Sequence, residues 1–473
     1  MLKHNLRPPV KSELLALLAA HGQEHLLAFW DASGERERAS LAAEVRQIDF
    51  ALLARLHAGP QGGADVRAMA DRAASPRAFR LGEGGDRFSP DDARRAGSEA
   101  IQAGRIGAML VAGGQGTRLG FDHPKGMFPI GPVSGKSLFQ WHAEKILAVT
   151  RRHGTRLPWY VMTSPATHAA TVECFDRHER FGLPAEDVQF FCQGTMPAVD
   201  RATGKVLLAE PDRVALSPDG HGGMLAAFRS SGALADARRR GVEHLFYFQV
   251  DNPLADVCSP EFLGYHLLAG SEFSTQVVRK REPLERVGNV VEVDGRLRVI
   301  EYSDLPDEVA RRRKPDGSLE IWAGSIAIHA MDTAFLEQMA ASAEGLPFHL
   351  AYKKVAYVDS AGERVEPEEP NAVKFERFIF DLMPAARRAI LVEVDPAEHF
   401  APLKNASGAK EDTPEMVKAA LVALHARWLR QAGAEVADGV DVEIGPLWAL
   451  DAADVASKLP PGTRIAKPTY FGD

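Results

Sequence analysis

A glycine-rich stretch with two cationic side chains follows a short apolar run in this chain of 473 residues. The run covers residues 106–111, and the stretch, residues 112–126, reads AGGQGTRLGFDHPKG. Three of its glycines lack the Cβ atom that would keep a ligand away from the backbone, and they tolerate positive φ: Gly113, Gly114 and Gly116. Consecutive N–H groups in such a loop bind anions, Arg118 offers a planar fork for two phosphate oxygens, and Lys125 adds a compact cation. The stretch therefore predicts a phosphate-binding loop after a buried strand.

Two common phosphate-loop motifs do not fit these residues. Residues 135–137 supply the final GKS of a P-loop, but Ile130 stands where that motif requires its first glycine. The dinucleotide fingerprint G-x-G-x-x-G fails at Leu119, because the next glycine, Gly120, comes one residue late. We therefore set aside a P-loop nucleotidase and a nicotinamide-dependent oxidoreductase.

The composition is that of an ordinary globular protein. Apolar residues make up 45% of the chain and charged residues 25%, which allows a sizeable core. The net charge of −8 lacks the positive field typical of nucleic-acid-binding proteins, and no apolar run is long enough to span a membrane. Three cysteines without a CxxC pair favour a reducing compartment: Cys174, Cys192 and Cys258. We expect a cytoplasmic protein that binds neither nucleic acid nor membranes.

The middle of the chain alternates apolar runs with amphipathic, helix-like stretches. Four runs are candidate strands: 106–111, 158–164, 187–193 and 244–252. A capping box, Ser137-x-x-Gln140, opens the helix predicted between the first two strands. Such alternation is typical of an α/β fold with a Rossmann-like, doubly wound sheet.

Antiparallel structure is predicted further along. Residues 289–304 hold two β-rich runs joined by Asp294-Gly295, a strong hairpin signal. Residues 319–330 are predicted as another strand, and residues 371–383 as a helix.

We divide the chain into a helical N-terminal attachment (1–98), a catalytic domain with the mixed sheet (99–395) and a small C-terminal α+β domain (396–473).

The glycine-rich stretch also carries a resemblance. Residues 110–131, LVAGGQGTRLGFDHPKGMFPIG, resemble the signature loop of eukaryotic-type (type 1) UDP-sugar pyrophosphorylases. The segments LSPDGHGGMLAAF, VDNPLADVCSPEF, WAGSIAIH and FAPLKNA follow in the order of that family, and UDP-N-acetylhexosamine pyrophosphorylases look most similar. The resemblance implies a GT-A-like nucleotidyltransferase fold. It also implies an activity, the reaction of UTP with a sugar 1-phosphate to give a UDP-sugar and pyrophosphate.

The resemblance assigns roles to residues on the UTP side of the site. Four glycines would hold the nucleotide: Gly113, Gly114, Gly116 and Gly220. Three cations would neutralise the phosphates: Arg118, Lys125 and Lys404. Gln193, at the end of a predicted strand, would read uracil through an amide that both donates and accepts. Asp251, at the end of another, would hold Mg²⁺, the expected cofactor.

The residues implied for sugar binding depart from the hexosamine pattern. Gly288 and Glu301 match the family, whereas His221 and Ser325 stand where the hexosamine enzymes carry asparagine. UDP-glucose pyrophosphorylases also carry a G-H-G loop. We expect N-acetylglucosamine 1-phosphate as substrate, with glucose 1-phosphate or a broad sugar range as the alternative. A UDP-sugar sensor without turnover is a remote third interpretation. Such a protein would not need the catalytic cations, yet Arg118 and Lys125 are both present.

Overall fold

The structure, a computed structural model, describes residues 11–59, 63–85, 87–342 and 345–472. The chain forms two compact units: Met1–Asp65, Gly194–Met224 and Leu346–Ile379 in the first, and Val66–Gln193, Leu225–Gly345 and Phe380–Asp473 in the second. These units do not follow the three consecutive segments predicted from the sequence, because the chain leaves the second unit twice to complete the first. Residues 1–10, 60–62 and 86 of the predicted attachment, residues 343–344 of the predicted catalytic domain, and Asp473 of the predicted C-terminal domain lie outside the described residues.

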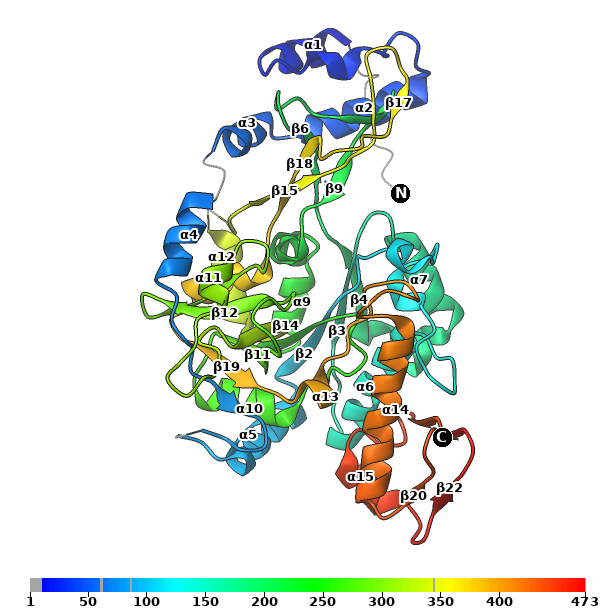
Figure 1. Cartoon of the computed structure of the whole chain (residues 1–473). Helices are drawn as coiled ribbons and strands as arrows, with labels where there is room; N and C mark the ends of the chain where they lie inside the picture. The colour runs from blue at the N-terminus through cyan, green and yellow to red at the C-terminus, as the bar shows by residue number, and fades with distance from the viewer. Residues whose placement is uncertain (1–10, 60–62, 86, 343–344, 473) are drawn as a thin grey trace. The chain divides into compact units, whose positions relative to one another are not determined.

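A ten-stranded mixed sheet forms the core of the second unit (Figure 1). Its main path has the order β1-β19-β11-β14-β10-β2-β3-β4, and β12 and β13 extend from β14. The strands are β1 Phe79–Arg80, β2 Ile106–Val111, β3 Trp159–Thr163, β4 Val188–Cys192, β10 His244–Gln249, β11 Phe273–Arg279, β12 Gly288–Val293, β13 Arg296–Ile300, β14 Ala323–Asp332 and β19 Ala389–Glu393. The predicted α/β class with a doubly wound mixed sheet is confirmed.

The strand order changes direction between β2 and β10. From β2 the chain continues to its parallel neighbour β3 and then to β4, whereas β10 pairs in parallel with the opposite side of β2. Beyond β10, β14 runs antiparallel to both of its neighbours, β10 and β11. In open α/β sheets, ligands bind beyond the carboxyl ends of the strands where the order reverses. The loops after β2 and β10 therefore occupy the expected position of a ligand site.

Helices pack on this sheet, and two of them approach each other closely at a glycine. The main helices of the second unit are α5 Pro90–Gln102, α6 Leu138–His153, α7 His168–Arg177, α9 Ala233–Arg239, α10 Pro260–Leu268 and α12 Thr333–Ala341. The backbones of α5 and α10 touch, so that a Cβ atom on Gly97 would come within 1.8 Å of the Pro260 carbonyl oxygen. Ser137 caps α6 as predicted, accepting a bond from Gln140 N (3.2 Å). The Gln140 side chain bonds to Glu144, however, so the reciprocal half of the capping box is wrong.

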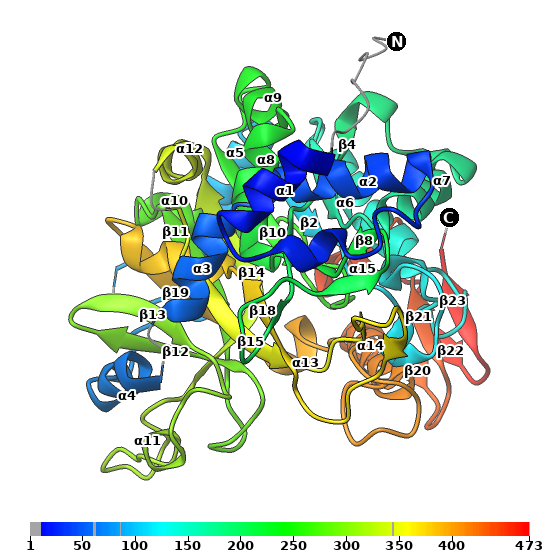
Figure 2. The ribbon, with the colours of Figure 1, turned by 90° about the horizontal axis from the view of Figure 1, so that it is seen from above.

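The C-terminal part of the second unit has a small core of its own. α14 Pro414–Gln431 and α15 Ala452–Lys458 pack with two parallel strand pairs, β20 Glu435–Val436 with β22 Arg464–Ile465 and β21 Val442–Ile444 with β23 Thr469–Phe471. Figure 2 shows α14 and these strands gathered together. Leu429, Ile444 and Val455 are among their shared buried residues.

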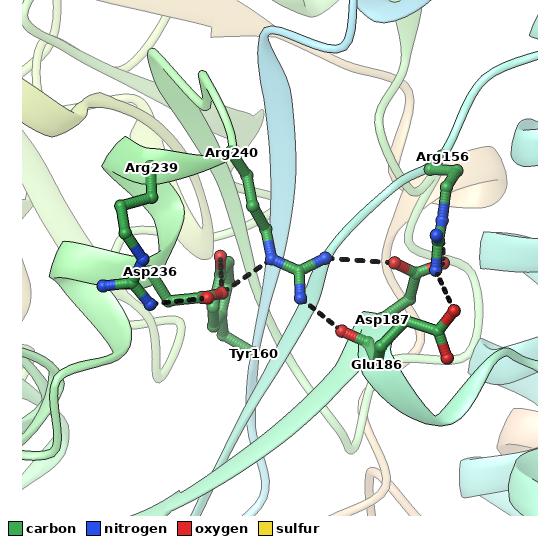
Figure 3. Close-up of polar contacts among 7 residues, drawn as sticks. All are labelled: Arg156, Tyr160, Glu186, Asp187, Asp236, Arg239 and Arg240. Carbon is green, nitrogen blue, oxygen red and sulfur yellow. Dashed lines mark hydrogen bonds and ion pairs between the residues drawn. The ribbon is translucent and has the colours of Figure 1, made fainter.

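An ion-pair network ties together the amino-terminal edge of the parallel strands (Figure 3). Arg156, just before β3, binds the Asp187 carboxylate (2.8 Å), which also binds Arg240 (3.2 Å). Arg240 continues to Asp236 (2.8 Å), and the Tyr160 hydroxyl donates to Asp236 (3.1 Å). Because this edge lies opposite the loops after β2 and β10, its charges serve the fold rather than the candidate site.

The first unit packs N-terminal helices on small antiparallel sheets. Its helices are α1 Lys11–Ala19, α2 Glu35–Gln47 and α3 Phe50–Ala58, and its largest sheet is β15 His349–Lys353, β18 Ala372–Glu376 and β6 Val199–Asp200. Short pairs complete it: β5 Thr195–Pro197 with β9 Leu216–Pro218, β7 Leu208–Glu210 with β8 Arg213–Val214, and β16 Tyr357–Val358 with β17 Arg364–Val365. Trp30, Leu41 and Phe50 share a core with Val199 and Phe375. The N-terminal helices therefore cover strands that the chain supplies much later.

One predicted helix is wrong, and one predicted hairpin is confirmed. Residues 371–383 form β18 followed by a 3₁₀ helix, Ile379–Ala385, because buried Val373 and Phe375 alternate with polar neighbours at a period of two. β12 and β13 form the predicted hairpin, with Asp294 and Gly295 both at positive φ. Within the described residues, no helix combines the length and apolarity needed to cross a bilayer.

Candidate active site

The glycine-rich loop after β2, residues 112–126, is called here the Arg118 loop. Its two arms are joined by hydrogen bonds from Lys125 N to Gly114 O (3.0 Å) and from Gly116 N to His123 O (2.9 Å). A Cβ atom on Gly116 would lie 2.6 Å from the Phe121 carbonyl oxygen, whereas one on Gly114 would meet nothing closer than 4.0 Å. The predicted glycines do not adopt positive φ, and in this loop only Gly120 does (φ 68°). Glycine therefore serves this loop in two ways: it allows close packing at Gly116 and leaves open space at Gly114.

The two cations of the Arg118 loop differ in their surroundings. Arg118 is exposed on a short 3₁₀ turn, Thr117–Leu119, and its guanidinium has no hydrogen-bond or ion-pair partner within the described part of the chain. Lys125 is largely buried, with 16% of its side chain exposed. Its ammonium lies 3.5 Å from the Asp251 carboxylate and donates to the Leu403 carbonyl (3.2 Å). The structure thus holds Lys125 in place and leaves Arg118 available to a ligand.

Asp251 follows β10, as predicted, and faces Lys125 with 13% of its side chain exposed. Its backbone carbonyl accepts from Leu403 N (2.8 Å). The neighbouring Asn252 is buried, donates to His399 O (2.8 Å) and accepts from Ala401 N (3.1 Å). Asp251 and Asn252 together attach the segment that leads to Lys404 to the end of β10.

A magnesium ion bound by one carboxylate and by substrate phosphates would fit Asp251, because Mg²⁺ usually keeps few protein ligands. Among the described residues, no group of three or more His, Cys, Asp and Glu side chains could hold a metal by itself. The carboxylate is largely buried and lies at the carboxyl edge of the sheet, beside a lysine. The residues present therefore suit a metal that enters with the triphosphate.

Gln193 lies beside the Arg118 loop, one residue after β4. Its side chain is 8% exposed, and a Cβ atom on Gly113 would come within 2.9 Å of its Oε1 atom. Ser164, after β3, donates to the Gly113 carbonyl (2.7 Å). The ends of β2, β3 and β4 therefore meet at Gly113, and they place an amide there that suits the edge of a base.

Three of the predicted sugar residues come together on the antiparallel side of the sheet. Gly288 on β12 pairs with Ser325 on β14, and a Cβ atom on Gly288 would lie 3.4 Å from the Glu301 carboxylate. Buried Asn289 keeps this corner in place by donating to Val287 O and Ile300 O (3.2 Å each). The structure thus brings Gly288, Glu301 and Ser325 into one cluster.

Gly220 and His221 belong to the first unit, in a loop of residues 219–223 called here the His221 loop. Gly220 has φ 82°, and a Cβ atom there would come within 2.4 Å of the Arg377 carbonyl oxygen. His221 stacks on Phe378 (5.3 Å between ring centroids), and its Nδ1 accepts from Ile379 N (3.2 Å). His221 therefore packs against a segment that lies far along the chain.

The protonation state of His221 follows from these contacts. Burial first, and nearby His349 second, lower the pKa of His221 to about 4. The neutral ring accepts at Nδ1, so its proton is on Nε2. Burial also raises the pKa of Asp219, although Arg377 partly opposes this effect.

A cavity of about 720 Å³ in the second unit is lined by none of the predicted site residues. It is lined by Trp141, Lys145, Leu424 and Trp428, among others. Lys145 donates to the carbonyls of Pro253 and Ala255 (2.7 Å each), behind the loop that carries Asp251. Burial lowers the pKa of Lys145 to about 8, although Asp256 opposes this shift. Lys145, on the wall of this cavity, therefore helps to hold the loop after β10 in place.

Sequence reasoning missed several residues that position the site. Asn252 and Leu403 attach the C-terminal segment, and Asp412 lies beside Lys404. Of these, only Asn252 carried a usable signal, because it adjoins Asp251 at a strand end. Leu403 contacts Lys125 across 278 residues and through a backbone atom, and the contact between Asp412 and Lys404 depends on the fold of the loop that joins them.

Comparisons with known proteins agree with this geometry. A family model described as UTP–glucose-1-phosphate uridylyltransferase matches residues 93–438. The chain is 40% identical over 445 residues to UDP-N-acetylhexosamine pyrophosphorylase-like protein 1 of Homo sapiens, a match covering 90% of this chain and 87% of the human protein. It is 41% identical over 357 residues to UDP-N-acetylglucosamine pyrophosphorylase of Saccharomyces cerevisiae, covering 74% and 75% of the two chains.

A solved structure extends the similarity to the fold. The crystal structure of the uridine diphosphate N-acetylglucosamine pyrophosphorylase from Trypanosoma brucei, in complex with an inhibitor, matches with a TM-score of 0.82 at 26% identity. That match covers 98% of this chain and 99% of the other. The family match spans well over half of the chain, and the human and yeast relatives are similar over most of it. The chain belongs to the UTP–glucose-1-phosphate uridylyltransferase family.

Proposed function

We propose that this protein transfers a uridylyl group from UTP to N-acetylglucosamine 1-phosphate, giving UDP-N-acetylglucosamine and pyrophosphate. One observation carries the proposal: Lys125 and Asp251 meet at 3.5 Å beyond the ends of β2 and β10, where the strand order reverses. A cation and a carboxylate at that edge suit a triphosphate and its metal. The human and yeast relatives, by name, act on UDP-N-acetylhexosamine or UDP-N-acetylglucosamine.

The chemistry is an in-line displacement at phosphorus. A phosphate oxygen of the sugar 1-phosphate forms a bond to the α-phosphorus of UTP. The bond from that phosphorus to the bridging oxygen breaks, and pyrophosphate leaves with the electron pair. No side chain becomes bonded to phosphorus, so the protein contributes position and charge. We assign Arg118, Lys125 and Lys404 to the phosphates, and the backbone at Gly113, Gly114 and Gly116 to the nucleotide.

Magnesium is the proposed cofactor, with Asp251 as its protein ligand. When bound, it would supply positive charge against the phosphate oxygens. The Asp251 carboxylate would serve the metal and also orients the Lys125 ammonium.

The proposal assigns the remaining residues to the two ends of the product. Gln193, packed on Gly113, would read uracil. Gly220, assigned to the nucleotide by the family resemblance, packs against the Arg377 backbone and lets the His221 loop adopt its conformation. Gly288, Glu301 and Ser325 form the cluster proposed for the sugar hydroxyls. His221, which the family resemblance places at the sugar, is assigned to the choice between sugars. A cytoplasmic location accompanies this proposal, supported by three cysteines that form no disulfide: Cys174, Cys192 and Cys258.

Glucose 1-phosphate is the second candidate substrate, favoured by the description of the matching family model and by His221 and Ser325. Pyrophosphate release from UTP and Mg²⁺ should be measured with four sugar 1-phosphates: N-acetylglucosamine, N-acetylgalactosamine, glucose and galactose. The proposal expects the highest kcat/KM with N-acetylglucosamine 1-phosphate. Preference for glucose 1-phosphate would establish the second candidate, and UDP-sugar binding without release from any of the four would indicate a sensor.

A further inference from the structure

Lys404 stands at the start of a loop that closes on a single residue, Asp412. The backbone N–H groups of Lys404 and Asn405 both donate to the Asp412 carbonyl (3.0 and 3.1 Å). The Asn405 side chain donates to Glu411 O (2.8 Å), which holds the two ends of the loop together. Thr413 then caps α14, so the loop joins a rigid helix directly after Asp412.

Asp412 adopts a backbone conformation that few side chains accept. Its φ is 58°, in the left-handed region, where aspartate, asparagine and glycine are tolerated best. That conformation is what directs its carbonyl back toward Lys404. An observed backbone outlier of this kind supports a hypothesis of function, because the surrounding structure must offset its strain.

The Asp412 side chain reaches Lys404 as well. Its Oδ2 lies 3.8 Å from the Lys404 ammonium, and the two side chains are 29% and 40% exposed. The Phe400 ring flanks the same ammonium, 5.8 Å from its centroid. A free lysine side chain samples many rotamers, so a counter-ion and a ring that restrict it reduce the entropy lost when a phosphate binds.

We infer that Asp412 is the positioning residue for Lys404, holding the lysine backbone through its carbonyl and the ammonium through its carboxylate. This inference rests on the proposed function, because it gives Lys404 a phosphate to contact. Asp412 itself touches no reacting atom. The carboxylate is loosely paired at 3.8 Å, so Lys404 can turn to a phosphate without breaking a short ion pair.

A double-mutant cycle tests this inference. Asp412→Asn removes the charge and tolerates the left-handed backbone, and Lys404→Met removes the ammonium. We expect Asp412→Asn alone to lower kcat/KM for pyrophosphate release about tenfold, and to lower it less than about twofold further in the Lys404→Met background. Equal losses in both backgrounds would overturn the inference, and so would a gain of activity in Asp412→Asn.

Two more variants separate positioning from folding. Asp412→Gly keeps the left-handed backbone without strain and lacks the carboxylate, so it should lose as much activity as Asp412→Asn. Asp294→Asn is the matched control, because Asp294 also has positive φ (52°) but pairs with Arg72 on a hairpin. The control should keep full activity. A rise in the Mg²⁺ concentration needed by Asp412→Asn would contradict the inference, since it would indicate a metal ligand.

UTP binding by calorimetry distinguishes failure of the inference from failure of the proposed function. The wild type, both single variants and the double variant are titrated with UTP and Mg²⁺. Coupling between the two residues in UTP affinity, without turnover in the wild type, would uphold the inference and reject the uridylyltransferase proposal. Full turnover in the wild type, with additive effects of the two substitutions in both assays, would reject the inference and uphold the uridylyltransferase proposal.

Discussion

The Arg118 loop and the His221 loop are both rich in glycine, yet glycine serves a different purpose in each. In the Arg118 loop, Gly114 borders open space beside Lys125, and Arg118 extends to solvent. In the His221 loop, Gly220 and Gly223 pack against the chain itself: a Cβ atom on Gly223 would come within 2.0 Å of the Asp219 carboxylate. The first loop leaves room for a ligand, and the second uses its glycines to fold upon β18.

This difference shows that glycine density alone does not identify an anion-binding loop. What separates the two is charge: the Arg118 loop carries permanent cations, whereas His221 is held neutral by burial. We expect the Arg118 loop to govern the rate of phosphate chemistry and the His221 loop to govern the choice of sugar. The variants below test this division of labour.

The largest effect is expected at Lys125. Lys125→Ala removes a held ammonium from the phosphates and should lower kcat at least about tenfold, roughly 1.4 kcal/mol or more, with little change in Tm. Lys467→Ala, at an exposed lysine of the C-terminal segment, is the control and should match the wild type. A folded Lys125→Ala variant with unchanged turnover would remove Lys125 from the mechanism.

Replacing one glycine by alanine in each loop should show which glycine is tightly packed and which borders open space. Gly223→Ala forces a methyl group against Asp219 and should lower the free energy of unfolding by about 1–3 kcal/mol. In Gly114→Ala the added methyl group meets only the Lys125 side chain, at an unstrained 4.0 Å, so its stability should match the wild type while any loss appears in KM for UTP. Chemical denaturation of both variants measures the contrast, and equal stability losses would abolish it.

A smaller change in specificity is expected at His221. His221→Asn should shift the ratio of kcat/KM for N-acetylglucosamine and glucose 1-phosphates by about threefold or more, since an amide differs from an imidazole in size and in its hydrogen-bonding groups. Both substrates are assayed on one preparation, which cancels differences in active fraction. A ratio equal to that of the wild type would exclude His221 from sugar selection.

The smallest effect concerns pH. The folded pKa of His221, about 4, lies below its unfolded value near 6.5, so the ring is neutral throughout the range from about pH 6 to 8. The sugar ratio should therefore be constant across that range. The stability that the neutral ring contributes is complete above about pH 6.5 and is lost as pH falls toward 4. A ratio that changes between pH 6 and 8 would show that His221 is charged in the site.

Much of the fold could be predicted because its signals are local. Asp294-Gly295 specifies a hairpin turn by itself, and Gln193 and Asp251 end strands whose apolar runs are visible in the sequence. The β18 strand was mistaken for a helix because its alternation of Val373 and Phe375 is only a few residues long. Short apolar runs do not distinguish helix from strand without their tertiary partners.

The site could be predicted as residue types but not as contacts. Lys125 bonds to the carbonyl of Leu403, a residue 278 positions away, and backbone atoms carry no sequence signal. The His221 ring packs against a segment about 158 residues later, which no local pattern reveals. The left-handed conformation of Asp412 also depends on the closed loop around it.

Isotope exchange between pyrophosphate and UTP tests the central claim, direct uridylyl transfer, most directly. Labelled pyrophosphate, UTP and Mg²⁺ are incubated with the protein, first without and then with N-acetylglucosamine 1-phosphate or its UDP-sugar product. Direct transfer predicts label in UTP only when the sugar is present, with no uridylyl group attached to the protein. Exchange without sugar would indicate a covalent intermediate, and absence of exchange in every mixture would contradict the assignment of this chain as a uridylyltransferase.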